Sequence, residues 1–125
     1  MHVPIQVDYG IRALVDLAER VDDSPVRANE IARRRSIPEP YLARVLHTLQ
    51  KDEITKSQRG PQGGHSLSRD PSSITMSMVM ESLGGSQTLV NCLDDADQCD
   101  LTPSCMQREV WREVEEAINT VLSAT

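Results

Sequence analysis

The stretch from Glu30 to Lys51 decides the fold, and it reads EIARRRSIPEPYLARVLHTLQK. A short helix is predicted over 28–35, followed by a tight turn over 36–38. A second helix is predicted over 39–51, because leucines and valines recur there at i, i+3, i+4 and i+7 and give one apolar stripe. The stripe consists of Leu42, Val45, Leu46 and Leu49. A short helix, a tight turn and a longer helix with a basic outer face predict a helix-turn-helix.

A glycine-rich hairpin is predicted directly after this unit. Residues 54–58 form a short strand, 59–64 form a turn that reads RGPQGG, and 65–69 return as a second strand. Such a hairpin is the wing of a winged helix, whose glycines bring the backbone close to a phosphate while Arg59 enters the minor groove. A plain hairpin turn and a nucleotide cradle are the alternatives. No Gly-Lys-Ser/Thr opens a helix here, which disfavours a nucleotide.

Two amphipathic helices are predicted on either side of this core. The first begins near Pro4 and ends at 22–25, which read DDSP. Its apolar face consists of Val7, Ile11, Leu14, Ala18 and Val21. The second spans 102–123, and its stripe consists of Val110, Val114, Ala117 or Ile118, and Val121. In a chain this small, the second stripe either closes the core or pairs with another chain.

The composition limits the class of protein. A chain of 125 residues is one domain with a modest core. It has no run of 18 apolar residues and no basic-then-apolar leader, so we expect a cytoplasmic protein without a membrane segment. The aromatic residues are Tyr9, Tyr41 and Trp111. This scarcity favours duplex DNA over single strands or RNA, whose binding proteins stack bases on aromatic rings.

The net charge of −6 hides an asymmetry along the chain. Residues 27–69 carry nine Lys or Arg against four acids, a local net charge of +5. Residues 70–125 carry two Arg against ten acids, a local net charge of −8. Because phosphate attraction depends on the local field, the middle of the chain is the candidate DNA face. A solvated charged surface is the alternative.

Three cysteines, Cys92, Cys99 and Cys105, lie in the segment CLDDADQCDLTPSC. An odd set of thiols in a reducing compartment favours a metal or cluster site over a disulfide framework. The polar residues between the cysteines favour a loop. The C-x6-C-x5-C spacing lacks the close first pair of most zinc sites, so an iron-sulfur cluster is favoured over zinc. Three cysteines without any ligand are the remaining alternative.

Together, these motifs resemble a known family. EIARRRSIPEPYL at 30–42, RGPQGGHSL at 59–67 and the three cysteines resemble the winged-helix regulators that include the iron-sulfur sensors IscR and NsrR. The resemblance covers nearly the whole chain. It implies a helix over 74–85 after the wing and a C-terminal helix that pairs with its copy in a second subunit. The chain departs from the family at His65, where tyrosine is usual, and at 2–4, where a basic or polar pair is usual.

The resemblance also implies the ligands of a cluster. Cys92, Cys99 and Cys105 would supply three thiolates. Arg108 stands where IscR-type sensors carry a histidine. The NsrR-like branch is therefore the closer one, and in it an aspartate from the partner subunit completes a 4Fe-4S cluster; Asp8 is at the matching place. We expect 4Fe-4S in preference to 2Fe-2S. A carboxylate in the first turn also suits the helix dipole without any metal.

The expected organisation is a single structural unit in three segments. These are a winged helix-turn-helix over 1–84, a cluster-binding cysteine loop over 85–106 and a dimerisation helix over 102–125. A two-fold homodimer would set its recognition helices about 34–36 Å apart on a palindromic operator. The DNA-binding candidates are Arg33, Pro38, Pro40, Tyr41, Ala43, Arg44, His47, Arg59, Gly60, Gln62 and Gly63.

The predicted function is a homodimeric repressor whose cluster state sets operator affinity in response to nitric oxide, redox change or iron supply. Arg44, His47 and Ala43 are expected to read the major groove, and Arg59 and the wing backbone to hold the minor groove and phosphates. The alternative is a zinc-stabilised or cluster-free winged-helix repressor that responds to a small effector or a partner enzyme. No Ser-His-Asp or paired-carboxylate constellation is present, so we do not expect an enzyme.

Overall fold

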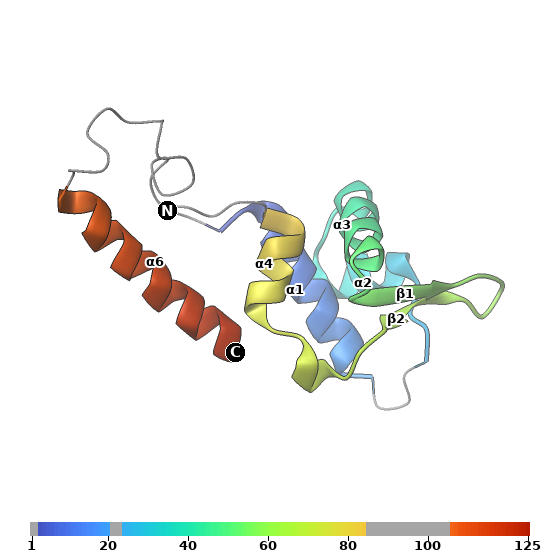
Figure 1. Ribbon diagram of the computed structural model, residues 1–125. Helices are drawn as coiled ribbons and strands as arrows, with labels where there is room; N and C mark the ends of the chain where they lie inside the picture. The colour runs from blue at the N-terminus through green and yellow to red at the C-terminus, as the bar shows by residue number, and fades with distance from the viewer. Residues whose placement is uncertain (1–2, 21–23, 85–105) are drawn as a thin grey trace.

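The computed structural model describes residues 3–20, 24–84 and 106–125. Figure 1 shows one body formed by the first four helices and the hairpin, with the C-terminal helix beside it. The elements in chain order are α1 (Ile5–Ala18), α2 (Ala28–Arg35), α3 (Glu39–Lys51), β1 (Thr55–Gln58), β2 (Gly64–Leu67), the 3-10 turn η1 (Pro71–Ser73), α4 (Met76–Gly84) and α6 (Met106–Ala124). The predicted fold class, mainly helical with a small antiparallel hairpin, is confirmed.

The two helices of the helix-turn-helix have the predicted bounds. Pro38 precedes the first turn of α3 and Pro40 lies within it, where the fixed φ of proline suits a helix start and its missing N–H is no loss. Both prolines are exposed. The predicted stripe of α3 is buried, with exposed fractions of 0–2% for Leu42, Val45, Leu46 and Leu49. The periodicity of 3.6 therefore predicted the inner face of α3.

The prediction that α1 has a single apolar stripe is wrong in part. Val7 and Leu14 are buried as expected, but Ala18 is exposed and α1 ends there; Val21 lies outside the described residues. A second side of α1 is also buried, and it carries Ala13 and Leu17. The reason is that α1 contacts α2, α3 and α4, so two of its sides face other helices.

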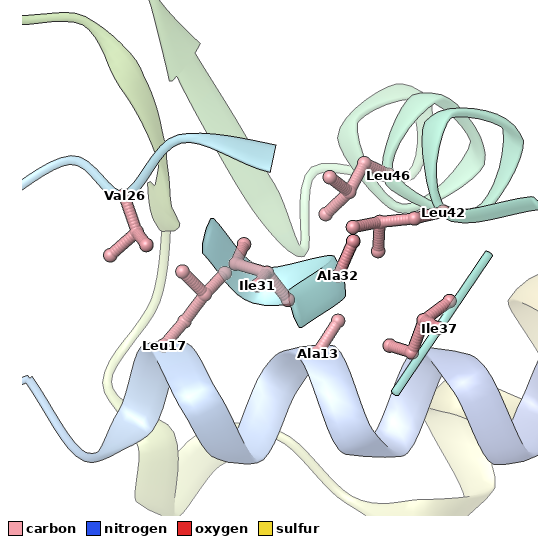
Figure 2. Close-up of a cluster of buried hydrophobic side chains, with 8 residues drawn as sticks. All are labelled: Ala13, Leu17, Val26, Ile31, Ala32, Ile37, Leu42 and Leu46. Carbon is pink, nitrogen blue, oxygen red and sulfur yellow. The ribbon is translucent and has the colours of Figure 1, made fainter. Parts of the chain in front are cut away.

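Two clusters of apolar side chains make up the core. Figure 2 shows the first, in which α1, α2, α3 and the strand residue Val26 converge. Its members are Ala13, Leu17, Val26, Ile31, Ala32, Ile37, Leu42 and Leu46. The second cluster joins the other side of α1 to α3, Ile54 and Val79 of α4. The helix-turn-helix and α4 are thus both packed on α1.

The packing of α1 against α4 depends on Gly10. A Cβ added at Gly10 would lie 2.3 Å from Cδ1 of Leu83. A larger residue at position 10 would therefore force the Leu83 side chain to move. α4 ends at Gly84, directly before the segment that contains the cysteines. The last turn of α4 therefore packs closely against α1 at Gly10.

The wing is an antiparallel hairpin that pairs Thr55 with Leu67 and Gln58 with Gly64. Its strands are shorter than predicted, because Ile54 and residues 68–69 lie outside them. No helix among the described residues is long and apolar enough to cross a membrane.

Candidate nucleic-acid interface

The turn between α2 and α3 is built on Ser36. Its φ of 54° and ψ of 50° are left-handed, a conformation that is uncommon for a residue with a side chain. The backbone N–H of Ile37 donates to the carbonyl oxygen of Ala32 at 3.0 Å, and the Ile37 side chain is only 4% exposed. This buried anchor and the left-handed cap fix the direction in which α3 leaves α2.

The outer face of α3 carries the side chains predicted for the major groove. Ala43, Arg44 and His47 are all exposed, and they lie within about one turn of each other. Tyr41, in the first turn, is 47% exposed. A guanidinium, an imidazole and a methyl group are thus grouped on one outer surface. These are the functional groups that read guanine, hydrogen-bond acceptors and the thymine methyl.

The three glycines of the wing have different roles. Gly60 has a φ of +105°, and nothing lies within 4 Å of the place where its Cβ would be, so its backbone is open to an approaching ligand. A Cβ at Gly63 would lie 2.1 Å from the carbonyl oxygen of Gln58, and one at Gly64 would lie 2.6 Å from the backbone of Val26. Gly63 is buried and serves the hairpin itself. Its assignment to DNA stays a prediction, as do those of the exposed Arg59 and Gln62.

The segment before α2 ties the wing to the rest of the domain, a feature that sequence reasoning missed. Val26 and His65 exchange two backbone hydrogen bonds, of 2.8 and 2.7 Å, and so form an isolated antiparallel bridge beside β2. The guanidinium of Arg27 donates to the carbonyl oxygen of Pro61 at the wing tip. The wing is therefore held along β2 and at its tip.

His65 lies in β2, one pair from the wing turn, at a position where the family usually has tyrosine. Burial lowers the pKa of His65 below its usual value. Its Nδ1 atom is buried and has no hydrogen-bond partner among the described residues. The imidazole is thus neutral at pH 7, because its protonation would bury a positive charge within the hairpin.

Two of the three arginines at the end of α2 are held by α1. Arg34 donates to both carboxylate oxygens of Asp16 at 3.0 and 2.8 Å, and Nε of Arg35 donates to Asp16 at 3.0 Å. Asp16 is 4% exposed, and the hydrogen bond from Arg34 lowers the pKa of its carboxyl despite burial. The positive charge counted over 27–69 is therefore partly neutralised. Arg33 is exposed and has no ion-pair partner among the described residues, so it is free to meet a phosphate.

Asp8 is the predicted metal ligand that lies within the described residues. Its side chain is 45% exposed, and its two oxygens accept hydrogen bonds from Arg12 at 3.2 and 3.0 Å. Nη1 of Arg12 also donates to the carbonyl oxygens of Arg35 and Ser36, at 3.2 and 3.4 Å. Arg12 thus connects Asp8 to the turn between α2 and α3. Sequence reasoning missed Arg12, although its spacing of four residues from Asp8 is typical of a helical ion pair.

The other predicted ligands, Cys92, Cys99 and Cys105, lie outside the described residues. Within residues 3–20, 24–84 and 106–125, no group of three or more metal-binding side chains is present. Asp8 itself could accept a metal, since each of its oxygens keeps a lone pair that Arg12 does not use.

Nearly the whole chain matches one known protein family. The family model named Rrf2, described as an iron-dependent transcriptional regulator, matches residues 4–125. The chain belongs to the Rrf2 family. This membership confirms the predicted family and the winged-helix fold, and it identifies the chain as a transcriptional regulator.

Several known regulators are similar to this chain in sequence and shape. The regulator IscR of Yersinia enterocolitica is 30% identical over 115 residues, which are 92% of this chain and 70% of that protein. The structure of T. potens IscR has a TM-score of 0.79 at 31% identity and covers 99% of this chain and 81% of its own. CymR of B. subtilis, the global cysteine regulator, has a TM-score of 0.82 at 26% identity and covers 100% of this chain and 92% of its own. These are named regulators, which confirms the prediction that the chain is not an enzyme.

The C-terminal helix of this Rrf2 protein has no buried residue in the single chain. It lies beside α4 through its C-terminal end, and the N–H of Met76 donates to the carbonyl oxygen of Thr125 at 2.9 Å. Its N-terminal half stands apart from the body (Figure 1). Val110, Val114 and Val121 of the predicted stripe are 57%, 39% and 64% exposed, and Ala117 is exposed with them. The stripe does not close the core of its own chain.

Proposed function

We propose that this Rrf2 protein is a homodimeric, iron-sulfur-dependent repressor of the NsrR-like branch, which binds palindromic duplex DNA with an affinity set by its cluster state. The observation that carries the proposal is the connection from Asp8 through Arg12 to the helix-turn-helix turn. The family description as iron-dependent and the similarity to IscR support the dependence on iron. Nitric oxide, redox change and iron supply are the signals that such a cluster would report.

The ligand set is the one that the resemblance to NsrR-like regulators implies. Cys92, Cys99 and Cys105 would hold a 4Fe-4S cluster together with Asp8 of the partner subunit. The cluster supplies iron whose ligation is altered by nitric oxide, oxygen or iron loss. A hard carboxylate is the weakest member of a thiolate set, so Asp8 is the ligand expected to leave first.

The chain's own residues convert this event into a movement at the DNA face. A free Asp8 carboxylate binds Arg12 through two hydrogen bonds, whereas an Asp8 engaged elsewhere releases those two donors. Arg12 also holds the carbonyl oxygens of Arg35 and Ser36, so its rearrangement changes how tightly the turn is fixed. The direction of α3 depends on that turn. Coupling of this kind is typically about 1–3 kcal/mol, which is enough to shift operator affinity 5- to 150-fold.

The DNA contacts are assigned to two surfaces. Arg44, His47 and Ala43 on α3 read base edges in the major groove, and Tyr41 and the prolines at the helix start approach the backbone. Arg59 enters the minor groove, while the open backbone at Gly60 meets a phosphate. Arg33 adds a phosphate contact from α2. Each subunit would thus hold one half-site.

The homodimer is assigned to α6. Val110, Val114, Ala117 and Val121 recur at steps of four, three and four residues, which puts them on one face of the helix. That face is exposed, while Arg112, Glu115, Ile118 and Leu122 are partly covered. A second copy of α6 is the partner that the family provides for this stripe. The two-fold pairing then sets the spacing of two α3 helices on a palindrome.

The first test compares cluster states of the whole protein. Purification without oxygen should give protein that contains iron and sulfide, and that protein should bind a palindromic duplex selected from a random pool. Nitric oxide should change that binding at least about fivefold. Binding that is equal before and after nitric oxide would remove the sensing half of the proposal and leave a DNA-binding repressor.

The second test isolates Asp8. Asp8→Ala should lose the cluster roughly 10-fold faster than wild type in air or nitric oxide, with little change in the melting temperature of the cluster-free protein. Asp70→Ala is the matched control, since Asp70 is an exposed carboxylate that caps only η1. Equal cluster retention in Asp8→Ala and wild type would refute the ligand assignment.

A cluster-free regulator with a small apolar effector is the second candidate. An apolar cavity of about 230 Å³ lies between α1, η1, α4 and the end of α6, and its lining includes Leu14, Val15, Ile74 and Thr125. Its lining joins the helix-turn-helix scaffold to the dimerisation helix. Protein without iron and sulfide, whose operator binding does not respond to nitric oxide, would favour this candidate.

A further inference from the structure

Two of the three aromatic side chains in the sequence contact each other across the α1–α3 interface. The rings of Tyr9 on α1 and Tyr41 on α3 have centroids 5.9 Å apart and are tilted by 59°. This centroid distance and this tilt are in the range at which aromatic pairs attract each other. Tyr9 is partly buried and packs against both core clusters, whereas Tyr41 is 47% exposed at the start of the recognition helix. Tyr9 is thus the fixed member of the pair and Tyr41 the member at the surface.

Each tyrosine carries a guanidinium over its ring. The Cζ atom of Arg12 lies 5.5 Å from the Tyr9 centroid, and that of Arg44 lies 6.0 Å from the Tyr41 centroid. The four side chains form a row in the order Arg12, Tyr9, Tyr41, Arg44. Cations within about 6 Å of a ring face are attracted to it. An exposed arginine otherwise samples many rotamers, and ordering it on DNA costs that freedom.

We propose that Tyr9 is a positioning residue for Arg44. Tyr9 fixes the Tyr41 ring, whose face holds the Arg44 guanidinium in one orientation, so the base preference at the position read by Arg44 depends on a residue of α1. The proposal rests on the proposed DNA-binding function of α3. It goes beyond it, because Tyr9 lies on another helix and is not among the residues assigned to DNA.

A purely structural role for Tyr9 makes a different prediction. If Tyr9 only fills space between the two core clusters, its replacement lowers stability and weakens DNA binding at all positions of the operator alike. If Tyr9 positions Arg44, the loss is confined to the base pair or pairs that Arg44 reads. The position-by-position preference therefore separates the two roles.

The experiment measures binding of the full-length protein, purified without oxygen, to a library of duplexes with single substitutions around the selected palindrome. The variants are Tyr9→Leu, which keeps apolar bulk without the ring, Tyr9→Phe, which keeps the ring, and Arg44→Ala, which marks the positions read by Arg44. Thermal unfolding of each variant gives its stability. Tyr9→Met replaces Tyr9→Leu if the latter does not fold.

Tyr9→Leu should lower discrimination about 2- to 5-fold at the positions that Arg44→Ala flattens, and it should leave the other positions unchanged. Tyr9→Phe should keep the wild-type profile. An unchanged profile in Tyr9→Leu, or an equal loss at every position, would overturn the proposal while leaving DNA binding intact. A wild-type protein without any base preference would instead remove the proposed function, and this proposal with it.

Discussion

The helix-turn-helix body and α6 differ in how they are stabilised. Among the residues that the structure describes, the 14 buried hydrophobic ones lie between Val7 and Val79, in α1–α4, the turn, the wing base and the segment before α2. α6 is 19 residues long and has no buried residue, although its apolar stripe is as regular as that of α3. An amphipathic pattern therefore predicts that a face needs a partner, and it does not say which chain provides the partner. The body buries its apolar side chains within one chain, whereas the exposed stripe of α6 would be covered only in the proposed homodimer.

The largest loss of stability is expected in the body, on replacement of a core leucine. Leu42 is 0% exposed, so Leu42→Ala should lower the free energy of unfolding by about 2–5 kcal/mol. Urea denaturation measures this difference. A loss below about 1 kcal/mol would mean that the α2–α3 core is not the stabilising unit that the comparison assumes.

A smaller loss is expected at Asp16, which joins α1 to α2 through Arg34 and Arg35. Asp16→Asn should cost about 2–3 kcal/mol near pH 7, because charge-assisted hydrogen bonds to a buried carboxylate are lost. Glu19→Gln is the control, since Glu19 is 64% exposed and its pair with Arg35 should contribute less than about 1 kcal/mol. Equal effects of the two substitutions would contradict a special role for Asp16.

The same residue gives the body a dependence on acid. The folded pKa of Asp16 is depressed, so its contribution is complete above the unfolded value near 4 and is lost as the pH falls through the folded pKa. Wild-type stability should therefore fall more steeply below pH 4 than that of Asp16→Asn. Urea midpoints at pH 2.5–5 test this, and parallel curves for the two proteins would contradict it.

A still smaller dependence on acid is expected at His65 of the wing. Burial lowers the folded pKa of His65, so the unfolded chain takes up a proton first as the pH falls below about 6.5, and stability declines from there. His65→Phe should remove this part of the pH dependence. Urea midpoints at pH 5–7.5 measure the difference, and a wild-type curve that is flat over this range and matches the variant would count against the prediction.

The smallest effect on unfolding is expected in α6. Val114→Glu should change the unfolding free energy of the monomer by less than about 0.5 kcal/mol, because Val114 is already 39% exposed. It should nevertheless shift the protein from dimer to monomer in sedimentation experiments. Glu116→Gln, on another face of α6, should leave the dimer unchanged. A dimer that is unaffected by Val114→Glu would place the interface elsewhere.

Much of the fold could be predicted from sequence where a single periodicity decides it. The bounds of α2 and α3 and the buried stripe of α3 followed from the 3.6-residue spacing. The two buried sides of α1 could not be predicted in this way. A single periodicity predicts a single buried face, whereas α1 packs against α2, α3 and α4 on two of its sides. The Asp16 pair was missed because the arginines of α2 were counted only as surface charge, and no local pattern shows that Asp16 of α1 packs against them.

The site was predictable in part for a similar reason. The exposed face of α3 is the complement of its apolar stripe, so Arg44 and His47 could be assigned to it from spacing alone. The links from Arg12 to the turn and from Tyr9 to Tyr41 join residues more than 20 positions apart. No local pattern carries such contacts, since they depend on how α1 packs across α2 and α3. The assignments to DNA and to the cluster stay predictions.

The attachment of the wing has a consequence for the DNA itself. Val26 and Arg27 fasten the hairpin along β2 and at its tip, directly before α2 begins. The groups proposed to enter the major and minor grooves are therefore presented at a set separation. A duplex must supply the matching groove geometry by its own bending and twisting, whose cost depends on sequence. Base pairs that no side chain contacts should thus influence affinity through their stiffness.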